Sequence, residues 1–495
     1  RELLDWLRAR QVEAGIAWVP PHEGADAGPA ANSDAASAPA APPSPAALRR
    51  AQAQALAEAM AASLPESASA RAKDPDRWRM TELLGQLVEF HRREDKPVWW
   101  SLFDRAETDD DERRDDPTCL AGLVREAGAP VPIKKSLGVW YRFDPLQETK
   151  AHEGSKARLA GAIDVTCEIE ELEGERGRVL LKFGPSAVAK LPGGEFPAQT
   201  TLLLHDYVPS DAIEASILAT ATAWHERRTI RPALRDLLLR HAPRVNGLAG
   251  GPLVRDGEDP VAATTRLVRD LDASVLCVQG PPGTGKTYTA ARVIAALVKD
   301  GRRVGVTSQS HKAILNLLGE CARAMGEDFR CLKVSSGESD DDAAFAIANP
   351  GAEIAESGKA IGRLSSHKLV GGTAWFFTKA AVAAAFEVLF VDEAGQVSLA
   401  NLVGMAPSAK SLVLLGDPMQ LPQVVQGTHP GDSGLSCLEH VLFGHETVPP
   451  ELGVFLPTTQ RLHPSLCEFV SGAFYEDRLE SLPETALPGE PPPLF

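Results

Sequence analysis

Long apolar runs are missing from this sequence of 495 residues. No stretch reaches the roughly 18 consecutive apolar residues that indicate a membrane-spanning helix. Cysteine is sparse as well: the seven residues are scattered, and none belongs to a C-x-x-C pair, which argues against a zinc ribbon. Reduced thiols are the simplest interpretation, so we expect a cytoplasmic protein without a membrane partner.

Positive charge is in deficit. The chain has 51 Lys and Arg against 67 Asp and Glu, a net charge of -16. Nucleic-acid-binding proteins usually carry a basic footprint, so this balance argues against such a partner without excluding a local basic groove. The acidic residues concentrate in residues 104–116, 168–175 and 338–342, which we expect to be solvated loops or faces.

The first quarter of the chain changes texture twice. Residues 1–19 have a helical pattern, and residues 20–47 are rich in Ala, Pro and Ser, which is typical of a disordered linker. Residues 48–127 form an accessory helical region. Within it, residues 78–93 predict an amphipathic helix that stops near Pro97.

The remaining chain divides into a β-rich part, a helical part and an α/β part. Residues 128–208 carry short β-rich runs separated by turns, which predict a small β-barrel. Residues 209–257 return to helical patterns. From residue 258 apolar strands alternate with helices, which predicts an α/β fold with a parallel sheet covered by helices on both faces. The expected strands are residues 274–280, 302–308, 367–375, 387–394 and 411–417.

Residues 279–290 read QGPPGTGKTYTA and contain the pattern G-x-x-x-x-G-K-[ST] between a strand and a helix. Glycines let backbone N–H groups surround phosphate oxygens, and the helix N-terminus adds its positive dipole end. Lys286 is expected to reach the β- and γ-phosphates, and Thr287 to hold Mg²⁺. A merely structural Gly/Pro turn explains less of this context. The predicted ATP-binding residues are Gly280, Pro281, Pro282, Gly283, Thr284, Gly285, Lys286 and Thr287.

Two further strand ends carry reactive polar residues. VLFVDEAGQ, residues 388–396, delivers Asp392 as a second Mg²⁺ ligand and Glu393 as the acceptor of a proton from the attacking water. Adjacent carboxylates at a buried strand end are costly unless a metal and a water use them. LVLLGDPMQLPQV, residues 412–424, places Gln420 to sense the γ-phosphate or the catalytic water.

GPPGTGKT, DEAGQ and GDPMQLPQV, in this order, resemble motifs I, II and III of superfamily 1 helicases. The resemblance is greatest to the 5′-to-3′ group of RNA-decay helicases and nuclease-helicases. TQRLHPSLCEFVSGAFY, residues 459–475, resembles motif IV, in which Arg461 matches the arginine that touches the γ-phosphate. Thr459 and Gln460 depart from the usual Gln and Tyr, and no adenine-reading Gln motif is evident.

Two segments resemble the family's strand-contacting motifs. VTSQSHKAILNLL, residues 306–318, resembles motif Ia, although an ordinary strand-to-helix turn explains it too. VGGTAWFF, residues 370–377, resembles the next such motif. The residues that the resemblance implies as nucleic-acid contacts are Thr307, Ser310, His311 and Thr373.

The resemblance also implies a domain order. Residues 128–208 match the place of the family's 1B barrel, residues 209–257 its helical stalk, and residues 258–495 its first RecA-like domain. HRREDKPVWWSLFDR, residues 91–105, resembles a segment of bacterial proteins that join a RecB-like nuclease to such a helicase, and is otherwise a charged helix end. The chain begins with Arg and ends after motif IV. We therefore expect a fragment whose second RecA-like domain lies downstream and any nuclease module upstream.

The predicted function is ATP-dependent translocation along single-stranded DNA or RNA, with ATP and Mg²⁺ as cofactors. A P-loop kinase is one alternative, but it does not explain GDPMQLP and TQRLHP. A non-catalytic, nucleotide-gated clamp is the other, but it has no need of the base Glu393.

Overall fold

The computed structural model describes residues 44–205, 207–337 and 339–482. The helix expected at residues 1–19 and residues 20–43 of the linker expected at residues 20–47 lie outside these ranges. The end of that predicted linker is wrong, because helix α2 begins at Pro45. None of the described helices is long and apolar enough to cross a membrane. All seven cysteines are described, and each is a buried free thiol, in agreement with the absence of C-x-x-C pairs.

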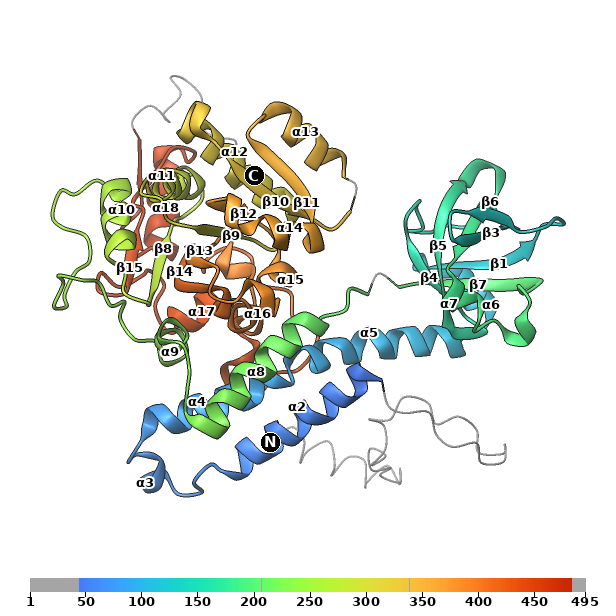
Figure 1. The fold of residues 1–495 in the computed structure, drawn as a ribbon, viewed down its shortest axis with the longest axis horizontal. Coiled ribbons are helices and arrows are strands. Elements are labelled where there is room, and N and C mark those ends of the chain that lie inside the picture. Colours follow the sequence, from blue (N-terminus) through green and yellow to red (C-terminus); the bar gives the residue numbers. More distant parts are fainter. Residues whose placement is uncertain (1–43, 206, 338, 483–495) are drawn as a thin grey trace. The chain divides into compact units, whose positions relative to one another are not determined.

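The centre of the fold is an eight-stranded sheet (Figure 1). Its strands are all parallel, in the order β11-β10-β12-β9-β13-β14-β8-β15. The α/β, RecA-like fold class expected from the sequence is thereby confirmed. The strands are β8 Val275–Gln279, β9 Val304–Thr307, β10 Cys331–Ser335, β11 Ala352–Glu356, β12 Leu369–Gly371, β13 Phe386–Val391, β14 Ala409–Gly416 and β15 Gly453–Phe455.

Alternating side chains of the strands feed two separate hydrophobic cores. In β8, Leu276 and Val278 belong to one core, while Val275 and Cys277 belong to the other. Such two-sided burial is what a parallel sheet requires. The first core is covered by α10 Pro260–Asp270, α11 Lys286–Lys299 and α12 His311–Met325. The second is covered by α8 Asp211–Arg227, α9 Pro232–Leu239, α15 Ala374–Phe377, α16 Leu399–Met405 and α17 Cys437–Val441.

Helices from before the barrel share the second core. Leu84 and Leu87 of α4 are buried in the same cluster as Ile213 and Ile217 of α8 and the strand residues of the sheet. The accessory helices and the stalk are therefore built into the RecA-like part of the molecule. The helices of this N-terminal region are α2 Pro45–Ala62, α3 Ala68–Arg71, α4 Pro75–Val88 and α5 Phe90–Glu107.

The helix expected at residues 78–93 is two helices, and the second continues past its expected end. α4 ends at Val88, and α5 runs through Pro97. Proline leaves the carbonyl four residues earlier, that of Arg93, without its helical partner. That carbonyl lies against Gly427, where an added Cβ would sit 2.5 Å from the oxygen. The loop around Gly427 therefore packs on α5 at the turn that precedes Pro97, a residue that the sequence pattern places at the end of a helix.

The β-rich part is an antiparallel sheet in the order β1-β7-β4-β5-β6-β3-β2, and an additional β1–β3 pairing closes it into a barrel. The sequence pattern predicts that the barrel begins at residue 128, but its first strand begins earlier, at Cys119. Leu120, Tyr141, Ile169 and Leu181 are among the residues that fill its core. The strands are β1 Cys119–Arg125, β2 Val131–Ile133, β3 Ser136–Arg142, β4 Lys156–Leu159, β5 Ala162–Glu173, β6 Arg178–Phe183 and β7 Gln199–Leu204.

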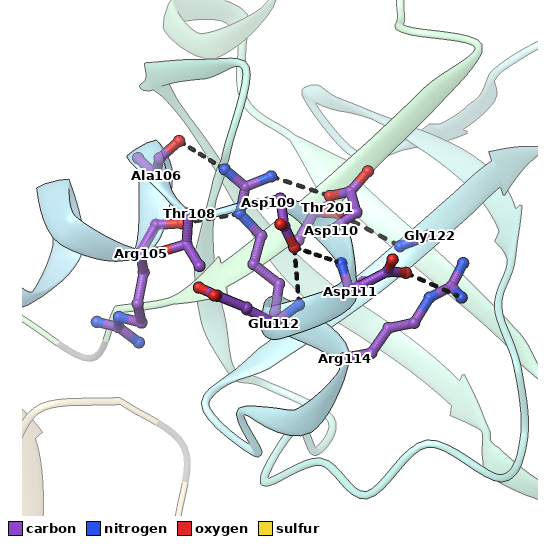
Figure 2. Close-up of polar contacts among 12 residues, drawn as sticks. Arg105, Ala106, Thr108, Asp109, Asp110, Asp111, Glu112, Arg114, Gly122 and Thr201 are labelled. Carbon is purple, nitrogen blue, oxygen red and sulfur yellow. Dashed lines mark hydrogen bonds and ion pairs between the residues drawn. The ribbon is translucent and has the colours of Figure 1, made fainter.

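The acidic run at residues 104–116 is more ordered than a solvated loop. It contains helix α6, Asp110–Asp115, whose first turn is capped by the carboxylate of Asp109. Asp110 Oδ1 accepts hydrogen bonds from Arg113 at 2.9 Å and from Thr201 of β7 at 3.0 Å (Figure 2). All acidic side chains of α6 are exposed, as expected of a solvated face, and the carboxylate of Asp110 also joins the helix to β7 of the barrel.

The remaining helices and strands lie in the RecA-like part and the barrel. α13 and α14 connect strands at the β11 edge of the sheet. These elements are α7 Pro185–Val188, α13 Asp340–Ala348, α14 Ser357–Arg363, α18 Pro464–Phe474, β16 Thr458–Thr459 and β17 Glu480–Ser481.

Candidate nucleotide and strand site

The predicted phosphate loop joins the end of β8 to the first residue of α11. Gly283 and Gly285 have φ angles of +79° and +78°, in the left-handed region that favours glycine. Gly283 also has no room for a side chain, because an added Cβ would lie 2.5 Å from Cβ of Arg461. The hydroxyl of Thr284 donates to the carbonyl of Pro281 at 2.8 Å and holds the turn.

Lys286 lies at the start of α11, and its side chain folds back across the loop. Its Nζ donates to the carbonyl oxygen of Gly280 at 2.6 Å. The ammonium group is thus placed inside the curve of the loop, where phosphate oxygens are expected to bind. Thr287 follows in the first turn of the helix and is half-buried.

Asp392 and Glu393 follow β13 directly. Asp392 is 5% exposed, and its backbone N–H donates to the carbonyl of Thr307 on the neighbouring strand at 2.8 Å. Burial, assisted by the negative charge of Glu393, raises the pKa of Asp392 to about 6. The positive charge of Lys286 acts in the opposite direction. Glu393 has a φ of +52°, an uncommon conformation for a residue with a side chain.

Asp417 organises the segment that follows β14. It is 3% exposed, and its Oδ2 accepts hydrogen bonds from Nε2 of Gln420 at 3.0 Å and from the hydroxyl of Tyr475 at 2.7 Å. Nε2 of Gln279 approaches Oδ1 at 3.4 Å. Sequence reasoning missed Asp417 and Tyr475 as positioning residues. The Gly-Asp pair at a strand end was the available signal for Asp417, and the signal for Tyr475 was its place at the end of the segment that resembles motif IV.

The segment at residues 459–461 packs directly onto the phosphate loop. The hydroxyl of Thr459 donates to the carbonyl of Pro282 at 2.8 Å, and the backbone N–H of Gln460 donates to the carbonyl of Gly283 at 2.9 Å. Thr459 therefore has a structural role here. Arg461, the next residue but one, is exposed.

These segments enclose a cavity of about 420 Å³. It brings together Glu393, Gln420 and Arg461 with most of the phosphate loop. Gly280 and Asp392 are buried residues outside its lining. The lining residues are Pro281, Pro282, Gly283, Thr284, Gly285, Lys286, Thr287, Tyr288, Glu393, Gln420, Gln460 and Arg461.

No cluster of three or more His, Cys, Asp or Glu side chains in the described ranges could hold a metal by itself. A magnesium ion that arrives with a nucleotide does not need such a cluster, because phosphates and water supply most of its ligands. The hydroxyl of Thr287 and the carboxylate of Asp392 are oxygen donors of the kind that Mg²⁺ prefers. The buried carboxylate of Asp392 gains from a nearby cation, so this donor set fits the ion.

The four expected strand contacts differ in accessibility. Thr307 is 1% exposed, and its hydroxyl lies 3.8 Å from the sulfur of Met405. Because β9 is an inner strand of the sheet, the hydroxyl of Thr307 does not reach the surface. Ser310 is exposed and caps α12 through a 3.1 Å hydrogen bond from the N–H of Ala313. Thr373 is half-buried at the start of α15.

His311 is held by a buried ion pair between Lys333 and Asp342. The expectation that residues 338–342 are solvated is wrong for Asp342, which is 4% exposed. Lys333 is fully buried and donates to Oδ1 of Asp342 at 2.8 Å and to Nδ1 of His311 at 3.0 Å. Because an ammonium group only donates, Nδ1 accepts and the ring proton is on Nε2. Burial and the charge of Lys333 lower the pKa of His311, so the ring is a neutral donor.

Part of the chain that forms this cavity is similar to known proteins. Residues 262–432 match the family described as the AAA domain. The chain is 28% identical over 205 residues, 41% of its length, to the DNA replication ATP-dependent helicase/nuclease JHS1 of Arabidopsis thaliana. It is 30% identical over 239 residues, again 41% of its length, to the ATP-dependent helicase NAM7 of Saccharomyces cerevisiae.

These similarities cover only part of each relative, 15% of the first and 24% of the second. Among solved structures, the crystal structure of the Arterivirus nonstructural protein 10 (helicase) aligns with 72% of this chain and 59% of its own. Its sequence identity is 13% and its TM-score is 0.34.

Proposed function

We propose that this chain is the nucleotide-binding part of a superfamily 1 helicase that hydrolyses ATP to move along single-stranded DNA or RNA. The observation that carries the proposal is the cavity in which Glu393, Gln420 and Arg461 face the phosphate loop. A P-loop that only binds nucleotide has no need of this surrounding set. The ATP-dependent helicases to which the chain is similar support the same conclusion.

Each side chain has a distinct proposed role in hydrolysis. The loop N–H groups and Lys286 bind the phosphates, and Arg461 adds a second positive charge beside the γ-phosphate. Gln420, oriented by Asp417, positions the attacking water, and Glu393 accepts its proton. Preorganised charges of this kind supply most of the catalysis in phosphoryl transfer. Thr287 and Asp392 are the proposed ligands of Mg²⁺, which neutralises phosphate charge when bound.

Strand binding is proposed for the surface formed by Ser310, His311 and Thr373. Hydroxyl and neutral imidazole donors suit phosphate oxygens, and such contacts are independent of base sequence. Thr307 is buried and is not proposed to touch the strand. It belongs to the sheet that positions the neighbouring contact residues. A 5′-to-3′ direction, a second RecA-like domain and a linked RecB-like nuclease are proposed from family resemblance, and a cytoplasmic location from the composition.

The proposal is tested by ATP hydrolysis with and without single-stranded DNA or RNA. We expect strand-stimulated turnover that falls by at least about 100-fold in Glu393→Gln, because the proton acceptor is lost. Nucleotide binding should survive in that variant and weaken in Lys286→Ala. Asp328→Asn, at an exposed carboxylate, is the matched control. Turnover indifferent to both nucleic acids would contradict a motor, and phosphate transfer to another acceptor would indicate a kinase.

A further inference from the structure

A second cavity, of about 440 Å³, lies beside the proposed strand surface. Its wall includes Gln309, which immediately precedes Ser310, and Trp375, two residues after Thr373. It shares no lining residue with the nucleotide cavity. Cavities of roughly 300–1,000 Å³ enclose small organic groups. A strand that contacts Ser310 and Thr373 therefore passes the mouth of a space large enough for one of its bases.

The charge of the wall excludes phosphate as the occupant. No Lys or Arg lines the cavity, whereas Glu94 and Asp95 do. Both carboxylates already have partners: Glu94 Oε1 lies 2.6 Å from Nε2 of His429, and Asp95 accepts from the hydroxyl of Tyr207 at 2.9 Å. An uncharged group with hydrogen-bonding edges is the complementary ligand.

Two buried polar atoms of lining residues have no hydrogen-bond partner in the described structure: Nδ1 of His91 and Oε1 of Gln423. His91 is 8% exposed, and its Nε2 lies 2.9 Å from Oδ1 of Asn401. Burial lowers the pKa of His91, so the ring is neutral, Nε2 donates and Nδ1 is an acceptor. A buried acceptor left unpaired costs about 1–3 kcal/mol. Both atoms therefore call for N–H donors on a ligand.

The same wall presents aromatic rings in fixed positions. Trp375 is 37% exposed, and its indole N–H donates to the carbonyl of Pro209 at 2.8 Å. Tyr207 is held by its bond to Asp95. The ring of Tyr207 already stacks on His205, with centroids 5.7 Å apart, so the partly exposed indole of Trp375 is the stacking partner that the wall offers to an unpaired base.

We propose that this cavity receives one unstacked nucleobase of the bound single strand, preferentially a base with an exocyclic amino group that donates to His91 Nδ1 and Gln423 Oε1. The inference rests on the proposed function and adds base selectivity to it. The amine at the Watson–Crick edge of adenine or cytosine offers two N–H donors, one for each acceptor, whereas thymine and uracil offer only the single N3–H. The preference is therefore separate from the sequence-independent phosphate contacts.

Fluorescence anisotropy of the full chain with oligo-dC, oligo-dT and an abasic strand of equal length tests this at neutral pH. We expect oligo-dC to bind about five- to tenfold tighter than oligo-dT, the ratio that one good hydrogen bond provides. Gln423→Leu should bring that ratio close to one and leave the abasic strand unaffected. Gln423→Glu keeps an acceptor and should keep the preference.

Gln52→Leu, the same change at an exposed position of α2, is the control and should retain the wild-type ratio. A dC-to-dT ratio that survives Gln423→Leu would overturn the proposal, as would equal weakening of all three strands by that variant. Failure of every strand to bind the wild-type chain would instead contradict the proposed function, so the two failures are distinguishable.

Discussion

Asp392 and Glu393 are consecutive carboxylates in unlike surroundings. The first is buried and accepts the N–H of Glu393 at 3.0 Å, while the second is half-buried in a left-handed backbone conformation that turns it toward the nucleotide cavity. Neighbouring carboxylates with separated environments can serve separate roles, one toward a metal and one toward a proton. Cation binding then offsets the free-energy cost of burying the charged carboxylate of Asp392.

Asp392→Asn should make the folded protein more stable near pH 7 in the absence of nucleotide and Mg²⁺. The folded pKa of about 6 lies above the unfolded value of roughly 3.9. The folded state thus binds the proton more tightly, and stability falls as the pH rises from 4 to 6. The expected gain of the variant is at most about 3 kcal/mol.

Urea unfolding at several pH values measures this difference. The gain should shrink as the pH falls and vanish by about pH 3, below the unfolded pKa, where wild-type Asp392 is protonated in both states. Asp328→Asn serves again as the exposed control, with little change expected at any pH. Equal stabilities of Asp392→Asn and wild type at neutral pH would show that this carboxylate is not penalised by burial.

At the scale of single elements, α5 is the least expected helix. It continues through Pro97, and its first turns contact the loop at residues 426–429. Glu94 accepts the backbone N–H of Gly427 at 2.8 Å, and the ring of Phe90 stacks on His429 with centroids 4.3 Å apart. This loop follows the segment that carries Gln420. The charged run near residue 91 thus has a structural role, whichever family it resembles.

Gly427→Ala should destabilise the protein by about 1–3 kcal/mol, the usual cost of overpacking. The added Cβ would lie 2.5 Å from the carbonyl oxygen of Arg93, so helix or loop must shift. Gly362→Ala, in the exposed part of α14 where nothing lies within 4 Å, is the matched control, with a gain of about 0.5–1 kcal/mol expected from helix propensity. Denaturant unfolding of both variants decides the matter, and a neutral Gly427→Ala would refute the close packing.

The elements that sequence predicted best are those with local causes. The phosphate loop was predictable because its glycines and the flanking apolar strand together favour a single backbone conformation. The contacts of Asp417 with Tyr475 and of Glu94 with His429 were not, because they join residues 58 and 335 positions apart. The burial of Thr307 and the continuation of α5 through Pro97 also depend on neighbours distant in the chain. Local sequence patterns do not predict such contacts.

For the molecule as a whole, the hydrophobic cores divide the chain differently from its sequence order. The barrel has a core of its own, whereas α4 and α8, which lie on either side of it in the sequence, share one core with the parallel sheet. An inserted unit with a separate core is expected to fold independently, and a shared core is expected to fold only when complete.

A polypeptide of residues 98–205, which keeps the part of α5 that packs on Cys119 and Leu203, should therefore fold by itself, with one cooperative thermal transition seen by circular dichroism. A polypeptide of residues 258–482 should not, since it lacks α4, α8 and α9 and would expose the sheet face that they cover. Heteronuclear NMR spectra distinguish dispersed from collapsed signals in both. A well-dispersed spectrum for residues 258–482 alone would contradict the shared core.

The seven buried thiols have a practical consequence for handling the protein. Burial raises the pKa values of the cysteines, to about 12 for Cys167, Cys277 and Cys331, and thiols held neutral in this way are poor nucleophiles. The native surface of the described chain therefore offers maleimides little to react with. A single cysteine engineered on any exposed helix becomes an addressable label, and none of the natural seven has to be removed first.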